Sequence, residues 1–226
     1  DNTQQTIGPK DIGDFQINTL FDHDGDGTPS SATVYFGADD SRQANDLYYD
    51  TTFVKLAGTY FIGDHVIFGG YEREQLDIFN MFVQHSRGGE LDFYSLEDFI
   101  NGDVGRYYYG SGTGTNDPTD AAGAFKYATN TAYLQDEYYY APMDMTITAG
   151  FRYDWYTSDD YPVENQNFIN RYGFTNASNL DGEGLFQPRF GINWNVSPEL
   201  EVRGGIGLYS GGNPNVWMTN NYQNTN

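Results

Sequence analysis

Apolar and polar residues alternate along several stretches of this chain. Residues 145–153 carry apolar or aromatic side chains at the odd positions and polar or small side chains at the even positions. The same period of two recurs in residues 186–196 and in residues 200–208. Such a period predicts β-strands with one apolar face and one polar face. Weaker forms of the pattern predict three further strands, at residues 53–60, 66–73 and 132–140.

An arginine stands on the polar face of each of the three clearest strands. These arginines are Arg152, Arg189 and Arg203. A charge that faces lipid at mid-bilayer costs about 2–4 kcal/mol, so in a membrane sheet the arginines are expected to point inward to a lumen. The residues expected to point outward to lipid are Ile147, Phe151, Phe190, Ile192, Val202 and Ile206.

The connections between the expected strands differ strongly in length. Residues 61–65, 141–144 and 197–199 form short turns, whereas residues 88–130 and 157–184 form long polar stretches. Short turns at one end of the strands and long loops at the other are typical of outer-membrane barrels, whose long loops are extracellular. A compact soluble domain seldom carries irregular loops of this length. The connections therefore favour a membrane barrel.

Composition and charge agree with a membrane barrel. The chain has 20 Tyr, 16 Phe and 3 Trp, and its formal net charge is −21. Aromatic girdles at the membrane interfaces, combined with a polar lumen and polar loops, account for both values. Only 11 Lys and Arg are present, which argues against a nucleic-acid partner, because phosphates attract cations. No run approaches the ~18 apolar residues of a membrane helix, and the one helical turn expected is residues 95–100, with Ser95 as N-cap.

The fold predicted by these patterns is all-β: an antiparallel transmembrane β-barrel. We expect residues 1–226 to form one partial barrel domain of about eight strands. Eight strands close a small barrel only where side chains fill its interior. The inward positions here are small or polar, as at Thr148, Gly191 and Gly205. We therefore expect an open sheet from the wall of a wider barrel, and a chain that is a piece of a longer protein.

The sharpest local motif is the acidic stretch at residues 22–33. Three aspartates and a glycine occupy its positions 1, 3, 5 and 6: Asp22, Asp24, Asp26 and Gly27. An EF-hand calcium loop begins in this way, because carboxylates converge on Ca²⁺ while glycine permits the tight turn. The bidentate Glu of position 12 is replaced by Thr33, and Asp39 or Asp40 is a candidate substitute. The motif predicts a calcium site, with a solvated Asp-Gly turn as the alternative.

Catalytic motifs are absent from the sequence. The three histidines are widely separated, which excludes a paired zinc motif. Glu72 and Glu74 are spaced like a pair that could mimic glycosidase carboxylates. In a barrel strand, however, they fall on one face, where solvated wall charges are expected. The sequence therefore predicts a protein that is not an enzyme.

Residues 185–217 (LFQPRFGINWNVSPELEVRGGIGLYSGGNPNVW) resemble the barrel of TonB-dependent receptors of the Oar-like type. The similar features are a Gln-Pro-Arg-Phe-Gly strand, an Arg-Gly-Gly-Ile-Gly strand and the Ser-Gly-Gly-Asn-Pro loop that follows. Residues 41–50 and 77–84 are similar to the same family. The resemblance extends over most of the chain from about residue 36, and it rests on this extent.

The resemblance implies a bacterial outer-membrane location and a barrel of about 22 strands. It also implies a plug domain and a TonB-contact segment, both expected outside this chain, and transport of an unidentified ligand. The residues leave a second class of function open: a soluble, calcium-stabilised β-rich module that binds carbohydrate or another ligand. Dependence on detergent distinguishes the two classes, because only a membrane barrel needs detergent to stay in solution.

Overall fold

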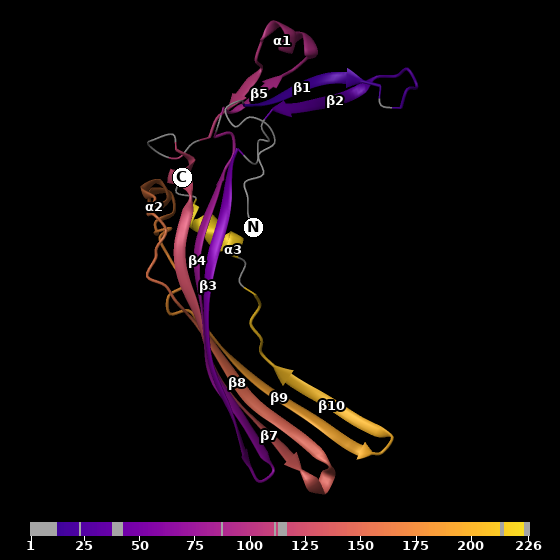
Figure 1. The fold of residues 1–226 in the computed structure, drawn as a ribbon, viewed down its shortest axis with the longest axis vertical. Coiled ribbons are helices and arrows are strands. Elements are labelled where there is room, and N and C mark those ends of the chain that lie inside the picture. Colours follow the sequence, from indigo (N-terminus) through magenta and orange to yellow (C-terminus); the bar gives the residue numbers. More distant parts are fainter. Residues whose placement is uncertain are drawn as a thin grey trace. The chain divides into compact units, whose positions relative to one another are not determined.

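The fold is all-β, with short helices in the connections and near the end of the chain (Figure 1). The computed structural model describes residues 13–22, 24–37, 43–86, 88–110, 112, 117–212 and 215–223. The strands are β1 (Asp14–Phe21), β2 (Ser30–Gly37), β3 (Ala44–Ile62), β4 (His65–Val83), β5 (Glu90–Phe93), β6 (Arg106–Tyr108), β7 (Gly123–Tyr140), β8 (Met145–Thr157), β9 (Gly184–Ser197) and β10 (Leu200–Gly207). The helices are α1 (Leu96–Asn101), η2 (Pro118–Ala121), η3 (Ala141–Met143), α2 (Gln166–Tyr172) and α3 (Asn215–Gln223). Within these ranges, no helix has the length and apolarity needed to cross a membrane.

Six strands form one sheet in the order β10-β9-β8-β7-β4-β3. The pairs β7–β8, β8–β9 and β9–β10 are antiparallel. β3 and β10 are the two edges, and no pairing joins them among the residues that the structure describes. The expected open antiparallel sheet is therefore confirmed, with six strands in this sheet where about eight were expected in the barrel wall.

Short and long connections alternate along this sheet. β3 turns into β4 at residues 63–64, β7 into β8 through η3 and Asp144, and β9 into β10 at residues 198–199. Gly63 and Asp144 have positive φ angles of 57° and 47°, which a tight reversal of the chain requires. The connection from β4 to β7 contains β5, α1, β6 and η2, and the connection from β8 to β9 contains α2.

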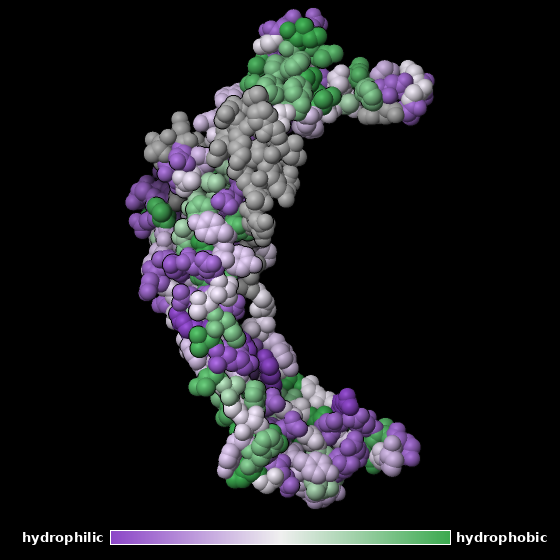
Figure 2. Space-filling model, viewed as in Figure 1, coloured by the Kyte–Doolittle hydropathy of each residue, from purple (hydrophilic) through white to green (hydrophobic). Residues whose placement is uncertain are grey.

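A second sheet has the strand order β2-β1-β5-β6, in which β1 and β5 are parallel. Its buried apolar residues include Ile17 and Phe93. An aromatic cluster adjoins them: Phe15 stacks on Phe36 at 5.2 Å, and Phe99 of α1 meets both Phe36 and Phe93 edge-on. Such pairs contribute about 0.5–1.5 kcal/mol each beyond area burial. Figure 2 shows hydrophobic residues gathered over α1 and the adjoining strands. The sequence pattern did not predict this sheet, because its strands are short and distant along the chain.

The chain divides into two compact units. The first consists of Asp1–Tyr48, Ile78–Ala124 and Thr219–Asn224, and it contains the four-stranded sheet. The second consists of Tyr49–Asp77, Phe125–Met218 and Thr225–Asn226, and it contains β8, β9 and β10. The charged residues of the six-stranded sheet that are described below all belong to the second unit. The acidic loop at residues 22–27 belongs to the first unit.

Helix α1 confirms the predicted helical turn and its cap. Ser95 has extended backbone angles, and its hydroxyl accepts a hydrogen bond from the amide of Asp98 at 3.0 Å. Gly102 ends the helix with a left-handed φ of 76°. Neither α2 nor α3 was predicted, because each is short and lacks an apolar repeat.

Replacing Ser95 with alanine is expected to loosen α1 selectively. The loss of an N-cap hydroxyl costs about 1 kcal/mol, because one helix amide loses its acceptor. Amide hydrogen exchange at Asp98 should therefore accelerate about fivefold. Ser31→Ala on the exposed surface of β2 is the control and should leave this exchange unchanged. Equal exchange at Asp98 in S95A and the parent protein would contradict the assigned cap.

Candidate functional site: the charged face of the six-stranded sheet

The strand register places the three predicted arginines on one face. Gly150 of β8 lies opposite Arg189 of β9, and Asn193 of β9 lies opposite Arg203 of β10. Arg152 is two residues from Gly150 and therefore shares its face. We call this the polar face. The opposite, apolar face carries Ile147, Phe151, Phe190, Ile192, Val202 and Ile206, so the predicted alternation is confirmed for these residues.

Large side chains on the apolar face are open to the surroundings. The exposed fractions are 39% for Phe151, 49% for Phe190 and 78% for Ile206. A sheet in a water-soluble protein buries its apolar face in a core, and large exposed apolar surfaces mark sites that lipid or another protein covers. The side chains of this face are therefore suited to an apolar environment.

Aromatic rings gather near both ends of β8 on the apolar face. Tyr138 and Tyr140 of β7 lie opposite Ile147 and Met145, next to the turn at η3. Toward the other end, Tyr153 stacks on Trp155 with ring centroids 5.4 Å apart. Amphipathic rings at two levels of a strand are typical of the girdles that flank a membrane-spanning apolar band.

A buried carboxylate organises the polar face where β7, β8 and β9 meet. Asp154 is 7% exposed, and its oxygens accept hydrogen bonds from Thr131 Oγ1 at 2.7 Å and from Gln187 Nε2 at 2.6 Å. Arg152 Nε donates to the same carboxylate at 2.8 Å, and Ser210 Oγ donates at 3.0 Å. We call these five residues the Asp154 cluster.

The Asp154 cluster also holds the segment that follows β10. The amide of Ser210 donates to Gln187 Oε1 at 2.7 Å, and the amide of Leu208 donates to the carbonyl of Pro188 at 3.0 Å. Gln187 is fully buried, with 0% exposure. Every polar group in this position needs a partner, since a buried unpaired group costs about 1–3 kcal/mol. The cluster therefore fixes the relative positions of several strands and a loop.

A second charged group lies on the polar face around Glu72. Lys55 Nζ is 2.6 Å from Glu72 Oε1, and Tyr133 donates a hydrogen bond to the same oxygen at 3.3 Å. Arg152 Nη1 lies 3.8 Å from Glu72 Oε2. Glu72 is thus a paired wall charge and not the solvated one that the sequence predicted, whereas Glu74 is exposed as expected. The two carboxylates are not arranged as an acid and base about a common point.

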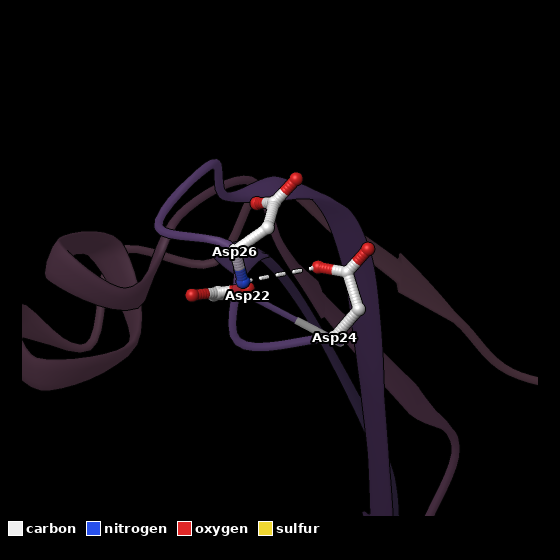
Figure 3. A group of neighbouring side chains, drawn as sticks. All are labelled: Asp22, Asp24 and Asp26. Atoms are coloured by element: carbon white, nitrogen blue, oxygen red, sulfur yellow. Dashed lines mark hydrogen bonds between the residues drawn. The ribbon is translucent and has the colours of Figure 1, made fainter.

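The acidic loop between β1 and β2 brings the three predicted calcium ligands together. Asp22, Asp24 and Asp26 each offer a carboxylate oxygen, and these oxygens lie within 4.8 Å of one another (Figure 3). Two oxygens that bind one Ca²⁺ at about 2.4 Å are separated by at most about twice that distance. The spacing of the three carboxylates is therefore compatible with a shared calcium ion.

Hydrogen bonds from the backbone already order this loop. Gly25 and Gly27 donate to the two carboxylate oxygens of Asp22 at 2.8 and 3.0 Å, and Thr28 donates to Asp26 at 2.6 Å. The bonds from Gly27 and then Gly25 hold the pKa of Asp22 below its ordinary value, so the group is anionic at neutral pH. Such bonds are also those of a solvated Asp-Gly turn. The suggested substitute ligands Asp39 and Asp40 lie outside the described residues.

The alternating sequence pattern did not predict that the members of the Asp154 cluster contact one another. Asp154 and Gln187 occupy polar positions of the alternating pattern, which was the only signal available. Their burial arises because β8 and β9 pair with the register Arg152–Gln187, and because Ser210 returns to the same place. Neither the register nor the return is encoded in local periodicity.

Comparison with known proteins agrees with this geometry. A family model described as "TonB dependent receptor-like, beta-barrel" matches residues 1–226. No curated protein and no solved structure matches the chain significantly. The open antiparallel sheet, with its exposed apolar face and charged polar face, is what a section of such a barrel requires. The chain therefore belongs to the TonB-dependent receptor β-barrel family, whose members are transporters of the bacterial outer membrane.

Proposed function

We propose that this chain is part of the wall of an Oar-like TonB-dependent receptor that carries an unidentified ligand across the outer membrane. The complete barrel has about 22 strands. The apolar face contacts lipid, and the polar face lines the lumen. A plug domain and a TonB-contact segment, in parts of the protein outside this chain, couple transport to energy. The subtype rests on the resemblance of residues 185–217.

The observation that carries this proposal is the open sheet with two unlike faces. Its apolar face exposes large side chains such as Phe190 and Ile206. Its edges, β3 and β10, have backbone groups that need partners, because an unpaired strand edge is not tolerated in lipid. Neighbouring strands of a wider barrel meet this need. The short turns then face the periplasm, and the long connections are extracellular. These connections are residues 84–122 and 158–183, so the first ends before the expected residue 130, because β7 begins at Gly123.

Transport is tested with cells that contain or lack the full-length protein. Each strain is grown on single nutrients at limiting concentration. A strain that contains the full-length protein but lacks TonB is grown in the same way. A growth defect on at least one nutrient is expected in both deletion strains. Recovery of the full-length protein from the aqueous fraction without detergent would contradict the proposal and favour a soluble ligand-binding module.

We further propose that Asp22, Asp24 and Asp26 bind Ca²⁺ in the loop between β1 and β2. The proposal is supported by the convergence of their oxygens within 4.8 Å and by the glycine at position 6 of the motif. Three carboxylates supply charge attraction, while backbone carbonyls and water complete the six to eight ligands that Ca²⁺ prefers.

Calcium is expected to protect this loop from proteolysis in the parent protein. In the double variant Asp24→Asn and Asp26→Asn, the calcium-dependent protection should be lost, because two anionic ligands become neutral. Asp159→Asn, an exposed aspartate between β8 and β9, is the control and should keep the protection. If calcium never changes the cleavage rate of the parent loop, the solvated turn is the correct interpretation.

A further inference from the structure

A hollow lies in the polar face of the second unit. Its volume is about 220 Å³. A hollow of this volume has room for several water molecules, and so for a small polar group of a solute. The polar side chains that line it are Lys55, Glu72, Tyr133, Gln135, Arg152 and Arg189.

The charge of this hollow is opposite to that of the whole chain. Lys55, Arg152 and Arg189 line it as cations, and Glu72 is the one carboxylate among its lining residues. The chain as a whole has 11 Lys and Arg against 32 Asp and Glu, for a net charge of −21. Three of its few cations thus meet at one place. Charge complementarity favours an anion there.

Arg189 is the cation of the hollow that lacks an internal partner. Lys55 is paired with Glu72, and Arg152 is paired with Asp154. The side chain of Arg189 makes no hydrogen bond and no ion pair with any residue in the described part of the chain, and its Nε atom is buried without a partner. The guanidinium charge is therefore not compensated within the described residues, so an external anion at its other nitrogens would be favourable.

The surroundings hold the Arg189 side chain in place and keep the space around it open. Its guanidinium carbon lies 4.6 Å from the centre of the Tyr209 ring, a cation–π contact. Its cross-strand neighbours are Gly150 on β8 and Gly207 on β10, which have no side chains to cover it. A held guanidinium loses less conformational entropy on binding, and its planar fork matches carboxylate and phosphate oxygens.

We propose that this hollow is a binding subsite for one carboxylate or phosphate group of a solute in the barrel. Arg189 forms the direct, two-pronged contact, and the Gln135 amide supplies a further hydrogen bond. Lys55 and Arg152, each already paired with a carboxylate, flank the site. The subsite rests on the proposed function in one respect: the polar face must line the lumen for a solute to reach it. The proposed subsite implies that the ligand carries an anionic group, whereas membership of the family does not specify the ligand's chemistry.

Anion binding is measured by calorimetry on the full-length protein in detergent, with citrate and inorganic phosphate as separate probes. Arg189→Gln is expected to weaken binding of the preferred probe at least about tenfold, the loss typical of one charge-assisted contact. The matched control is Arg203→Gln, which removes an arginine from the same face. Arg203 already pairs with Glu201 at 2.8 Å, so R203Q should leave the affinity unchanged.

Thermal unfolding shows whether each variant is folded. If R189Q does not fold, R189K provides the test: it keeps the charge but loses the planar fork, and an intermediate affinity is expected. The proposal is overturned if the parent protein binds neither probe at millimolar concentration, or if R203Q and R189Q weaken binding equally. It is also overturned if R189Q lowers the melting temperature while the parent binds no anion. In that last case, Arg189 would instead pair with an acidic side chain from another part of the full-length protein. Transport is not involved in these measurements, so their failure is separate from a failure of the growth test.

Discussion

Replacing Asp154 with alanine is expected to lower the free energy of unfolding by about 3 kcal/mol. Removal of one partner of a buried ion pair costs about 3–5 kcal/mol, because the other charge is left uncompensated. The lower end applies because the side chain of Arg152 is 33% exposed and has Glu72 as a second neighbour. Gln187 remains fully buried and loses an acceptor as well.

This effect is measured by denaturant unfolding of the full-length protein in lipid vesicles. Asp159→Ala provides the control, because Asp159 is exposed and close to Asp154 along the chain. The control should change the unfolding free energy by less than about 0.5 kcal/mol. Asp154→Asn should fall between the two, since the amide keeps an acceptor oxygen but loses the charge. If D154A and D159A are equally stable, the Asp154 cluster does not stabilise the fold.

An arginine in place of Phe190 is expected to cost about 2–4 kcal/mol in a lipid bilayer. Phe190 is on the apolar face and 49% exposed, so the new charge would meet the lipid directly. Its cross-strand neighbours are Ala149 and Ile206, and neither supplies a counter-charge. A smaller amount of F190R protein should reach the outer-membrane fraction, because the barrel is less stable in the membrane.

The matched variant is Thr148→Arg. Thr148 precedes Ala149 in β8 and points to the opposite, polar face. An arginine there enters the lumen, and unfolding in vesicles should show a much smaller loss than for F190R. Equal losses for the two variants would mean that the faces are wrongly assigned to lipid and lumen. If the sheet belonged to a soluble protein, the loss of unfolding free energy in F190R would be the same in vesicles and in detergent-free buffer.

The alternating pattern by itself determined the central part of the fold. The odd positions of residues 145–153 and the even positions of residues 186–196 were expected on one face, and the observed register confirms this arrangement. The cap at Ser95 was also readable, because it depends on residues only three positions apart. Strand ends were less accurate: β4 continues to Val83, ten residues past the expected end. Its later part carries polar and apolar side chains on both faces, so the period of two fades.

The tertiary structure decided the features that depend on distant residues. Asp154 became buried only because Gln187 and Ser210 come to it from β9 and from the segment after β10. The parallel pairing of β1 with β5 joins strands more than 60 residues apart. The cationic hollow likewise combines Lys55 with Arg189, which no local pattern relates.

The physical reason is the range of the interactions concerned. The face on which a side chain lies follows from the geometry of adjacent residues, because successive side chains of a strand point in opposite directions. A cap or an acidic turn likewise depends on a few neighbouring positions, so the convergence of Asp22, Asp24 and Asp26 could be expected from their spacing. Pairing register and the charge of a shared hollow depend on which strands become neighbours. Sequence alone therefore determined an amphipathic β-sheet, whereas the tertiary structure determined which polar groups meet on its charged face.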